Sequence, residues 1–522
     1  MRKTGKMWAA VMTAAAIMLI CGSAFASEQD QSNVQGFEPS CIPVMVIHID
    51  ESRGTIAAMN ESPDHSVRCY GTVDFIVPED FVCEYTDEVQ EGLEGLQLKY
   101  IRGRGNSTWS QPKKPYRLAF EEKVDFCGMG ESKNWGLLAN RFDNSLMRNR
   151  ITYWLGRELG MEFVPKCVPV DLVINDEYYG SYLLTELIRV EKSRVAIDPL
   201  DDAADEEPEI TGGYLIGTGP QTADPESDPD LLFTERGMSV ICVDPDFKES
   251  GTDKQKAYLA DYLQKTENAL FGENFADEEG VSYSEYLDVD SAVDYWWIQE
   301  LSMNSDAYGS DSTYLNKRRN DLLYWGPLWD FDYVTWGNLE TGDLIEYTGF
   351  YNEYNLWMNR LLWNEEFTGK LAARWTDIRE DLVRLVEDGG IIDQYYEQTK
   401  VSESYDVKKW GFYEIREGSL EEGHTYADET AWLKEWISLR MGWIDENIGN
   451  LEHPVRTVTF IADDEIISEV STLWGRFLPE MPEAPEKEGF TFAGWLTETG
   501  EVWEEGEETV TEDMKLYAGY QE

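Results

Sequence analysis

Two aspartates stand close together in an aromatic segment of the chain. Asp330 and Asp332 alternate with Trp329, Phe331 and Tyr333, directly after a Gly-Pro turn. Burying a carboxylate among apolar rings costs free energy unless the charge is paired or used for chemistry. Carboxylate oxygens are ligands for Mg²⁺ when that ion binds nucleotide phosphates. Both aspartates are therefore candidate metal ligands, and helix capping or ion pairing is the structural alternative.

A polar segment just before this pair adds further candidates. A helical pattern ends near Ser302, and the loop that follows contains Asp306, Asp311 and Ser312 before a strand-like stretch. In phosphoryl transfer one aspartate holds the acceptor hydroxyl while other carboxylates bind the metal. A single aspartate in a loop is usually a turn or cap residue. Only the combination of Asp306 with the later pair indicates transfer chemistry.

Positive charge is concentrated in one earlier window. Residues 100–120 contain no Asp or Glu, although the chain carries a formal net charge of −57. Five basic residues lie there: Arg102, Arg104, Lys113, Lys114 and Arg117. Gly103 and Gly105 permit a tight turn whose backbone amides can face an anion, and the adjoining Asn-Ser-Thr adds donors. We expect a phosphate site here; the alternative is pairing of these cations with acidic neighbours.

Glu186 ends an apolar strand-like segment, YLLTELI. A carboxylate in that place should be paired or should lie at the rim of a cleft. The candidates for an ion pair are Arg148 and Arg150, in the predicted helix between residues 142 and 159.

The rest of the sequence predicts the elements that hold these residues. Residues 42–120 form short apolar or alternating runs between turn residues, as strands do. A helix is expected over 142–159, followed by a two-stranded hairpin. The acidic, proline-containing stretch 198–230 is expected to be a solvated connection, with a calcium loop as the alternative. Long amphipathic helices are expected over 253–451, and short strands return after His453-Pro454, where we place a domain boundary.

The first 26 residues have the pattern of a secretory signal peptide, with a basic start, an apolar run and Ala-Phe-Ala before Ser27. We expect a secreted or cell-surface protein with no transmembrane segment after signal removal. Removal takes away three positive charges and no acids, so the net charge goes from −57 to −60. Such a chain repels nucleic acid and anionic membranes. The six remaining cysteines form either disulfides, in up to three pairs, or isolated buried thiols.

Five segments in this order resemble the CotH kinase family, spore-coat, secreted or surface proteins with an atypical protein-kinase-like fold. The segments are IRGRGNSTWSQPKKPYRLAF, NWGLLANRFDNSLMRNRI, VDLVINDEYYGSYLLTELI, NSDAYGSDSTYLNK and GPLWDFD. The resemblance implies an α+β fold with a two-lobed kinase-like domain at 27–450. Its smaller, sheet-rich lobe would cover about 42–190, and its larger, mostly helical lobe about 211–450.

The same resemblance implies roles for individual residues. Asp306 matches the catalytic-loop aspartate, and Asp330 or Asp332 matches the metal-binding acid, without a choice between them. Family members often carry Asn or Ser a few residues after the catalytic aspartate; here Asp311 stands at that place as a further candidate metal ligand. The candidate nucleotide-binding residues are Arg104, Lys114, Arg117, Arg148 and Glu186. The implied cofactors are ATP and Mg²⁺ or Mn²⁺.

Residues 455–522 resemble an internalin-type B repeat of the Listeria-Bacteroides family, a small β-grasp-like module that implies contact with a cell surface or partner. The expected function is a metal- and ATP-dependent Ser/Thr protein kinase with a basic acceptor protein. The alternative is an inactive kinase-like scaffold or adhesin that acts through the repeat. A carbohydrate-active protein is a third hypothesis, suggested by 19 Trp and many acids, although most of those Trp have the spacing of helix cores.

Overall fold

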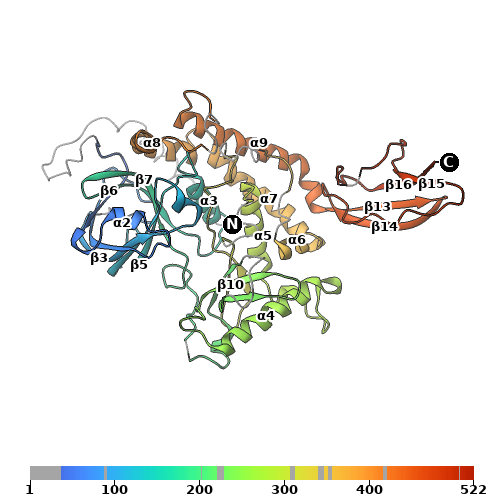
Figure 1. Cartoon of the computed structure of the whole chain (residues 1–522), viewed down its shortest axis with the longest axis horizontal. Coiled ribbons are helices and arrows are strands. Elements are labelled where there is room, and N and C mark those ends of the chain that lie inside the picture. Colours follow the sequence, from blue (N-terminus) through green and yellow to red (C-terminus); the bar gives the residue numbers. More distant parts are fainter. Residues whose placement is uncertain are drawn as a thin grey trace, which may run out of the picture.

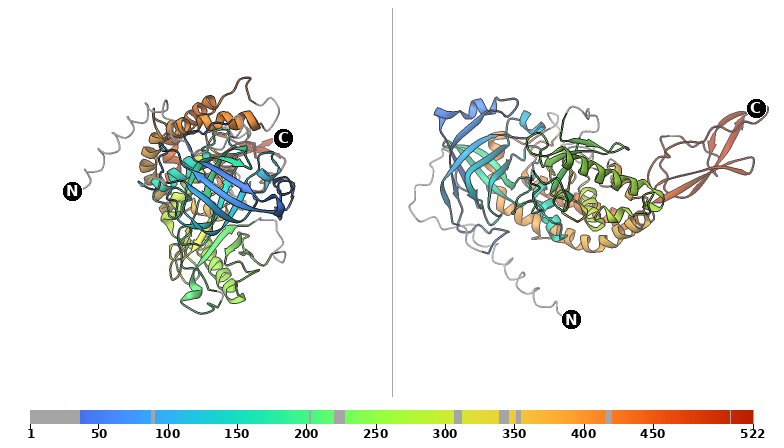
Figure 2. Two further views of the ribbon diagram at one scale, coloured as in Figure 1. Left: turned by 90° about the vertical axis from the view of Figure 1, so that its left-hand side faces the viewer. Right: turned by 90° about the horizontal axis from the view of Figure 1, so that it is seen from below.

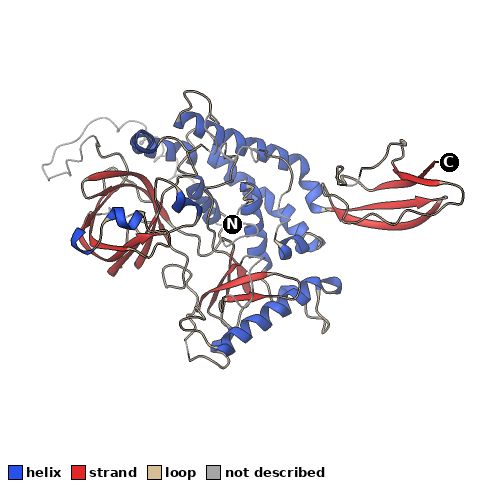
Figure 3. Ribbon diagram, in the orientation of Figure 1, coloured by secondary structure: helices blue, strands red, loops and turns tan. Residues whose placement is uncertain are grey.

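The computed structural model describes most of the chain. The described residues are 37–87, 91–201, 203–219, 228–305, 312–338, 346–350, 355–414, 420–504 and 506–521. The predicted signal peptide lies outside them, as do Asp306 and Asp311. The expected mixture of helices and sheets is confirmed: a barrel, a group of helices with a five-stranded sheet, and a C-terminal four-stranded sheet (Figures 1 and 3). Within the described residues, no helix has both the length and the apolar character to cross a membrane.

The first part of the chain closes into a barrel of seven strands in the order β1-β2-β3-β4-β5-β7-β6. The strands are β1 (Val44–Ile49), β2 (Arg68–Ile76), β3 (Leu93–Gly103), β4 (Tyr116–Val124), β5 (Ser132–Leu138), β6 (Cys167–Ile174) and β7 (Glu177–Glu186). Ile101 of β3 lies opposite Leu118 of β4, and both fill the interior. Because side chains alternate along a strand, the next pair, Arg102 opposite Arg117, faces outward.

The helical part contains a sheet of its own, in the order β12-β11-β8-β10-β9. These strands are β8 (Tyr214–Thr218), β9 (Leu231–Phe233), β10 (Ser239–Asp244), β11 (Tyr314–Lys317) and β12 (Leu323–Trp325). The stretch 198–230, expected to be only a solvated connection, therefore holds the central strand β8, all of whose residues are buried. The short apolar run YLIGT between the acidic flanks is long enough for a strand, and its burial overrides the polar composition around it.

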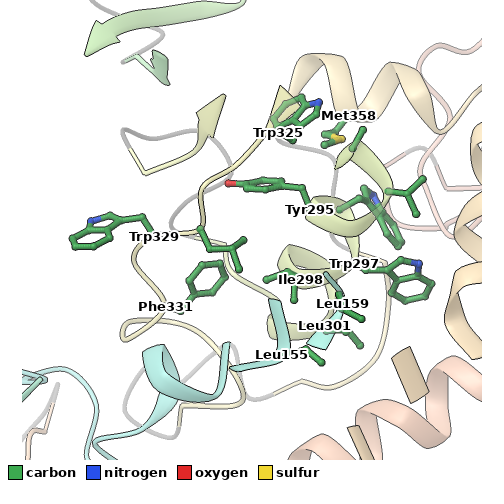
Figure 4. Packing of buried hydrophobic residues seen from close by; sticks show 14 of the residues in the cluster. Leu155, Leu159, Tyr295, Trp297, Ile298, Leu301, Trp325, Trp329, Phe331 and Met358 are labelled. Atoms are coloured by element: carbon green, nitrogen blue, oxygen red, sulfur yellow. The ribbon is translucent and has the colours of Figure 1, made fainter. Parts of the chain in front are cut away.

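The helices are α3 (Arg148–Glu158), α4 (Asp253–Phe271), α5 (Val289–Ser302), α6 (Leu356–Leu361), α7 (Glu365–Val386), α8 (Ile391–Trp410) and α9 (Tyr426–Glu452), besides the short α2 (Ile56–Asn60). α3 begins later than expected because the Asp143 carboxylate accepts from the Arg148 backbone amide (2.8 Å) and holds the preceding residues outside the helix. Figure 4 shows Leu155 of α3 beside Leu301 of α5 in the shared core. Trp297 of α5 stacks on Trp375 of α7 with ring centroids 5.2 Å apart.

The C-terminal sheet has the order β14-β13-β16-β15 and projects from the end of α9 (Figures 1 and 2). Its strands are β13 (Val455–Ala462), β14 (Glu465–Leu473), β15 (Thr491–Leu496) and β16 (Met514–Gln521). They enclose a separate small core around Phe460 and Trp495. Trp474 lies 6.1 Å, between ring centroids, from both Phe350 and Trp443, so the module is seated on the helical part by aromatic contacts.

A buried ion network joins α3, α9 and the loop after β12. The Arg148 side chain is fully buried and donates to Asp143 (2.5 Å), to Glu429 (2.9 Å) and to the Thr335 carbonyl (3.2 Å). A buried charge is tolerated only while its partners remain, so removing one member leaves the others uncompensated. The network therefore fixes the loop after β12 relative to two helices.

We expect Arg148→Ala to lower the free energy of unfolding by about 3–5 kcal/mol, because it leaves the buried Asp143 carboxylate without an ion pair and the buried Glu429 with only His424 as a charged partner. Arg384→Ala is the matched control, since this arginine forms ion pairs with Glu158 and Asp381 at the surface, and we expect a loss of about 1 kcal/mol or less. Urea denaturation followed by tryptophan fluorescence measures both. Equal losses in the two variants would contradict the structural role of Arg148.

A second set of buried charges lies where α8 packs on the barrel. Lys113 is buried and bonds Asp406 (2.6 Å) and the Ser181 carbonyl (2.6 Å). Glu403, only 8% exposed, lines a small pocket of about 20 Å³ beside them, with no hydrogen bond or ion pair to any described residue. Burial and the negative charge of Asp406 raise the pKa of Glu403 to about 7.

Because the pKa of Glu403 is about 7 in the folded protein and 4.5 ordinarily, the folded state holds this proton more tightly. Its contribution to stability is complete below pH 4.5 and is lost as the pH rises through 7. We expect Glu403→Gln to match the wild type near pH 4.5 and to exceed its stability by about 1–3 kcal/mol at pH 8. Glu397→Gln, at an exposed position of the same helix, should show no such pH-dependent difference. Chemical denaturation at a series of pH values tests this.

Candidate active site

The two aspartates of the aromatic segment lie in a loop held from three sides. The Asn149 side-chain oxygen in α3 accepts from the Phe331 amide (2.8 Å). Asn304, just after α5, donates to the Asp330 carbonyl (3.2 Å), and the Ser312 hydroxyl donates to the Asp330 carboxylate (2.8 Å). Asp330 itself has φ +69°, a backbone conformation that residues other than glycine seldom adopt. Where the chain is described, neither aspartate caps a helix or forms an ion pair.

The electrostatics of this pair suit a cation. Asp332 is buried, and burial together with the negative charges of Asp330 and Asp143 raises its pKa well above the ordinary value. A hydrogen bond to Asp330 raises the pKa of Asp332 further and so favours the form of Asp332 that keeps its proton. Two carboxylates this close cannot both ionise without a positive charge between them. A divalent cation would take the place of that proton, and the oxygen donors fit Mg²⁺ or Mn²⁺.

The other candidate metal ligands are beyond what the structure describes. Within the described residues no third acid, histidine or cysteine completes a three-ligand metal group with Asp330 and Asp332. Asp306 and Asp311 belong to the segment 306–311, which lies outside those residues. The residues that flank this segment, Asn304 and Ser312, nevertheless both bond Asp330. Described residues before and after this segment therefore contact Asp330.

Arg104 faces the same aspartates from the barrel. It is partly exposed and its guanidinium lies 5.3 Å from the Trp329 ring centroid. Burial lowers the pKa of Arg104, and the nearby charges of Asp330 and Asp332 oppose that shift. No ion pair closer than 4 Å neutralises Arg104 within the described chain, so its charge acts across the site.

Arg104 belongs to a group of arginines on the outer face of the barrel. Arg102 and Arg117 are cross-strand neighbours, and Arg68 of β2 lies opposite Arg102. Burial lowers the pKa of Arg117, and the positive charges of Arg102, Arg189 and Arg104 lower it further. Like charges directly opposite one another are destabilising unless a counter-charge lies between them. We call Arg102, Arg104 and Arg117 the arginine cluster; none of the three has a carboxylate ion pair among the described residues.

Lys114 lies at the edge of this cluster. Its ammonium donates to the Trp109 carbonyl and lies 5.0 Å from the Trp109 ring centroid. Burial lowers the pKa of His65, and the charges of Arg102, Arg104 and Lys114 contribute to that shift. His65 is therefore a further neighbour of the predicted phosphate window.

Two predicted nucleotide-binding residues have their side chains occupied elsewhere. Glu186 pairs with Arg194 (2.6 Å), so its expected pairing with Arg148 or Arg150 is wrong. Arg194 follows β7 in a short loop that turns back on the end of the strand, so the partner of Glu186 is near it in sequence and does not lie in α3. Burial raises the pKa of Glu186 to about 7, although Arg194 opposes this. Arg148 has all three guanidinium nitrogens engaged in its network and is fully buried, so its side chain is not accessible to a nucleotide.

The sequence patterns missed two polar side chains of α3 that point to this site. The Tyr153 hydroxyl and the Asn149 side-chain nitrogen are buried and lack a hydrogen-bond partner among the described residues. The negative charges of Asp330 and Asp332 raise the pKa of Tyr153, after burial and Cys167, which shows that they are close. The spacing of four residues, which places both on one helical face, was the available signal.

Comparison with known proteins places these residues in a family. A protein of Evansella cellulosilytica with the provisional name of a membrane protein is 34% identical over 161 residues, 29% of this chain. The match covers 22% of that relative's own length. A Listeria-Bacteroides repeat domain matches residues 457–519, as expected for the C-terminal module. The CotH kinase protein family matches residues 101–444, more than half of the chain, and the chain therefore belongs to the CotH kinase protein family.

Proposed function

We propose that this protein is a metal- and ATP-dependent kinase that phosphorylates Ser or Thr of a basic acceptor protein outside the cell. One observation carries the proposal: Arg104 of the arginine cluster, which has no carboxylate ion pair among the described residues, lies near the carboxyls of Asp330 and Asp332. Phosphates would satisfy the arginines, and a divalent cation would satisfy the acids. Membership of the CotH kinase family supports a phosphotransferase.

The described residues divide the work of such a reaction. Arg104 and its neighbours would bind phosphate oxygens, while the Trp329 ring keeps the Arg104 guanidinium in place. Asp330 and Asp332 would hold Mg²⁺ or Mn²⁺, and the bound ion neutralises negative charge on the transferred phosphoryl group. Asp306 would receive the proton of the acceptor hydroxyl. In this proposal the barrel and the helical part act as the two lobes of a kinase-like domain.

The second candidate function is a surface scaffold or adhesin that acts through the C-terminal module. The observation in its favour is that this module exposes large apolar side chains, namely Ile466 (64% exposed), Phe477 (50%) and Phe490 (43%). Surface attachment and catalysis are compatible, so the catalytic test below decides between an active kinase and an inactive scaffold.

We expect Asp306→Ala to abolish phosphoryl transfer with little loss of ATP affinity, because a group that receives a proton acts mainly in the transition state. Arg104→Ala should weaken ATP binding roughly 10-fold or more, the value of a charge-assisted hydrogen bond. Calorimetric titration with ATP and Mg²⁺ and transfer from labelled ATP measure these two effects. Arg384→Ala is the control for Arg104→Ala. Equal labelling by the wild type and the Asp306 variant would reject the catalytic assignment.

The proposed basic character of the acceptor protein follows from the negative net charge of this chain. Outside the arginine cluster the chain is strongly acidic, with 101 Asp and Glu against 44 Lys and Arg. We expect Ser peptides rich in Lys or Arg to be phosphorylated faster than matched acidic peptides, with an apparent affinity that falls as salt rises, because exposed charges are screened over about 8 Å at physiological salt. Equal rates for both peptides at every salt concentration would contradict a basic acceptor.

A further inference from the structure

A short segment after β2 ties the barrel to α3. We call residues 83–86, with the sequence Cys-Glu-Tyr-Thr, the strap. Glu84 forms ion pairs with Arg150 and with Arg157 (3.2 Å), both in α3. The Tyr85 hydroxyl donates to the Cys167 carbonyl and accepts from the Cys167 amide, each at 3.0 Å, at the start of β6. The strap thus contacts α3 and the barrel together.

The strap also packs closely on the turn between β4 and β5. A Cβ atom on Gly128 would lie 2.8 Å from the Thr86 Cβ and 3.2 Å from the Tyr85 carbonyl oxygen. Gly128 has φ +74° and the preceding Cys127 has φ +55°, so two successive left-handed residues turn the chain at this point. The two backbones approach so closely at Gly128 that only glycine fits. The same close approach brings Cys83, the first residue of the strap, next to Cys127.

Cys83 packs against the buried cluster of the barrel that contains Cys127, and a hydrogen bond between the two thiols shifts the pKa of both. Both cysteines are free thiols in this structure. They differ in access, because Cys83 is partly exposed whereas Cys127 is 1% exposed in the barrel core. They are far apart along the chain, so a bond between them would close a long loop.

The chemistry of the two thiols is asymmetric. The hydrogen bond from Cys127 stabilises the Cys83 thiolate and lowers the pKa of Cys83. The pKa of Cys127 is raised by the same contact and by burial. Burial raises the pKa of three other cysteines, Cys69 to about 11, Cys167 to about 12 and Cys242 well above its ordinary value. The thiolate is the nucleophile in disulfide exchange, so Cys83 is suited to react first.

We propose that Cys83 and Cys127 form a reversible disulfide that fastens the strap to the barrel. With a small disulfide as oxidant, the Cys83 thiolate attacks one sulfur and releases a small thiolate, leaving a mixed disulfide on Cys83. Cys127 then gives up its proton and attacks the Cys83 sulfur, which releases the second small thiolate. The chain loses two thiol protons and two electrons, and the oxidant becomes two thiols.

The disulfide between Cys83 and Cys127 would affect the contacts that the strap makes with α3. The strap holds Arg150 and Arg157 through Glu84, and α3 in turn carries Asn149, which bonds the Phe331 amide next to both aspartates. A disulfide restricts the unfolded chain and resists local opening of the segment that it joins. Oxidation would therefore stabilise the contact between the barrel and α3 without adding a residue to the candidate active site.

Thiol titration of the full chain tests the bond directly. The chain has seven cysteines, so we expect seven thiols in denaturant after reduction, and five after incubation of the folded protein with oxidised glutathione and removal of the reagent. Digestion without reductant should yield one linked peptide pair that contains Cys83 and Cys127, in monomeric protein. The oxidised protein should also melt several degrees above the reduced one.

Single substitutions separate this pair from the other cysteines. Cys83→Ala and Cys127→Ala should each keep six thiols in both states and melt at the same temperature in both. Cys69→Ala is the matched control, a buried barrel cysteine, which should fall from six thiols to four and keep the difference in melting temperature. Retention of all seven thiols by the oxidised wild type, or a linked pair of other cysteines, would overturn the proposal. None of these readouts depends on kinase activity.

Discussion

A single buried guanidinium holds the centre of the molecule together. Arg148 begins α3 and has bonds to Asp143 before it, to Glu429 in α9 and to the Thr335 carbonyl after the aromatic segment. A charged group that is buried loses its hydrogen bonds to water and needs a protein partner in their place. The three chain segments must therefore come together before the charged side chains of this network can be buried. This requirement places the chain after the aspartate loop, and the bonds from Asn149, Asn304 and Ser312 position the loop itself.

The candidate site beside Arg148 holds its acidic and its basic side chains in two separate groups. Asp330 and Asp332 lie together, and burial and the charge of Asp330 raise the pKa of Asp332, while the arginine cluster lies on the outer face of the barrel without carboxylate partners in the described chain. Separation of this kind costs stability in the empty protein, because like charges repel at short range. In the proposed function, a ligand of alternating charge, such as a metal-bound polyphosphate, would recover this cost by lying between the two groups. Preorganised charge is also the usual source of transition-state stabilisation.

Much of this arrangement could be predicted from sequence because it depends on local pattern. Alternation predicted the strands of the barrel, and the acid-free window predicted that Arg102, Arg104 and Arg117 would gather. The pattern did not reveal β8 inside an acidic stretch, since a run of five residues, of which Thr218 is polar, is a weak signal against polar flanks. Nor did it identify Arg194 as the partner of Glu186, or the internal role of Arg148. Ion pairs depend on which helices and strands contact one another, whereas hydrophobic periodicity indicates only which face of a single element is buried.

The C-terminal module has a consequence for geometry on a larger scale. Trp474 rests against Phe350 and Trp443, and the Arg476 guanidinium donates to the Phe350 carbonyl (3.1 Å). These contacts make the joint stiff where a flexible linker would allow free rotation. A molecule held by its exposed module would therefore present the barrel at a constant height and angle above its support. Targets would be selected by where they stand relative to that support as well as by their chemistry.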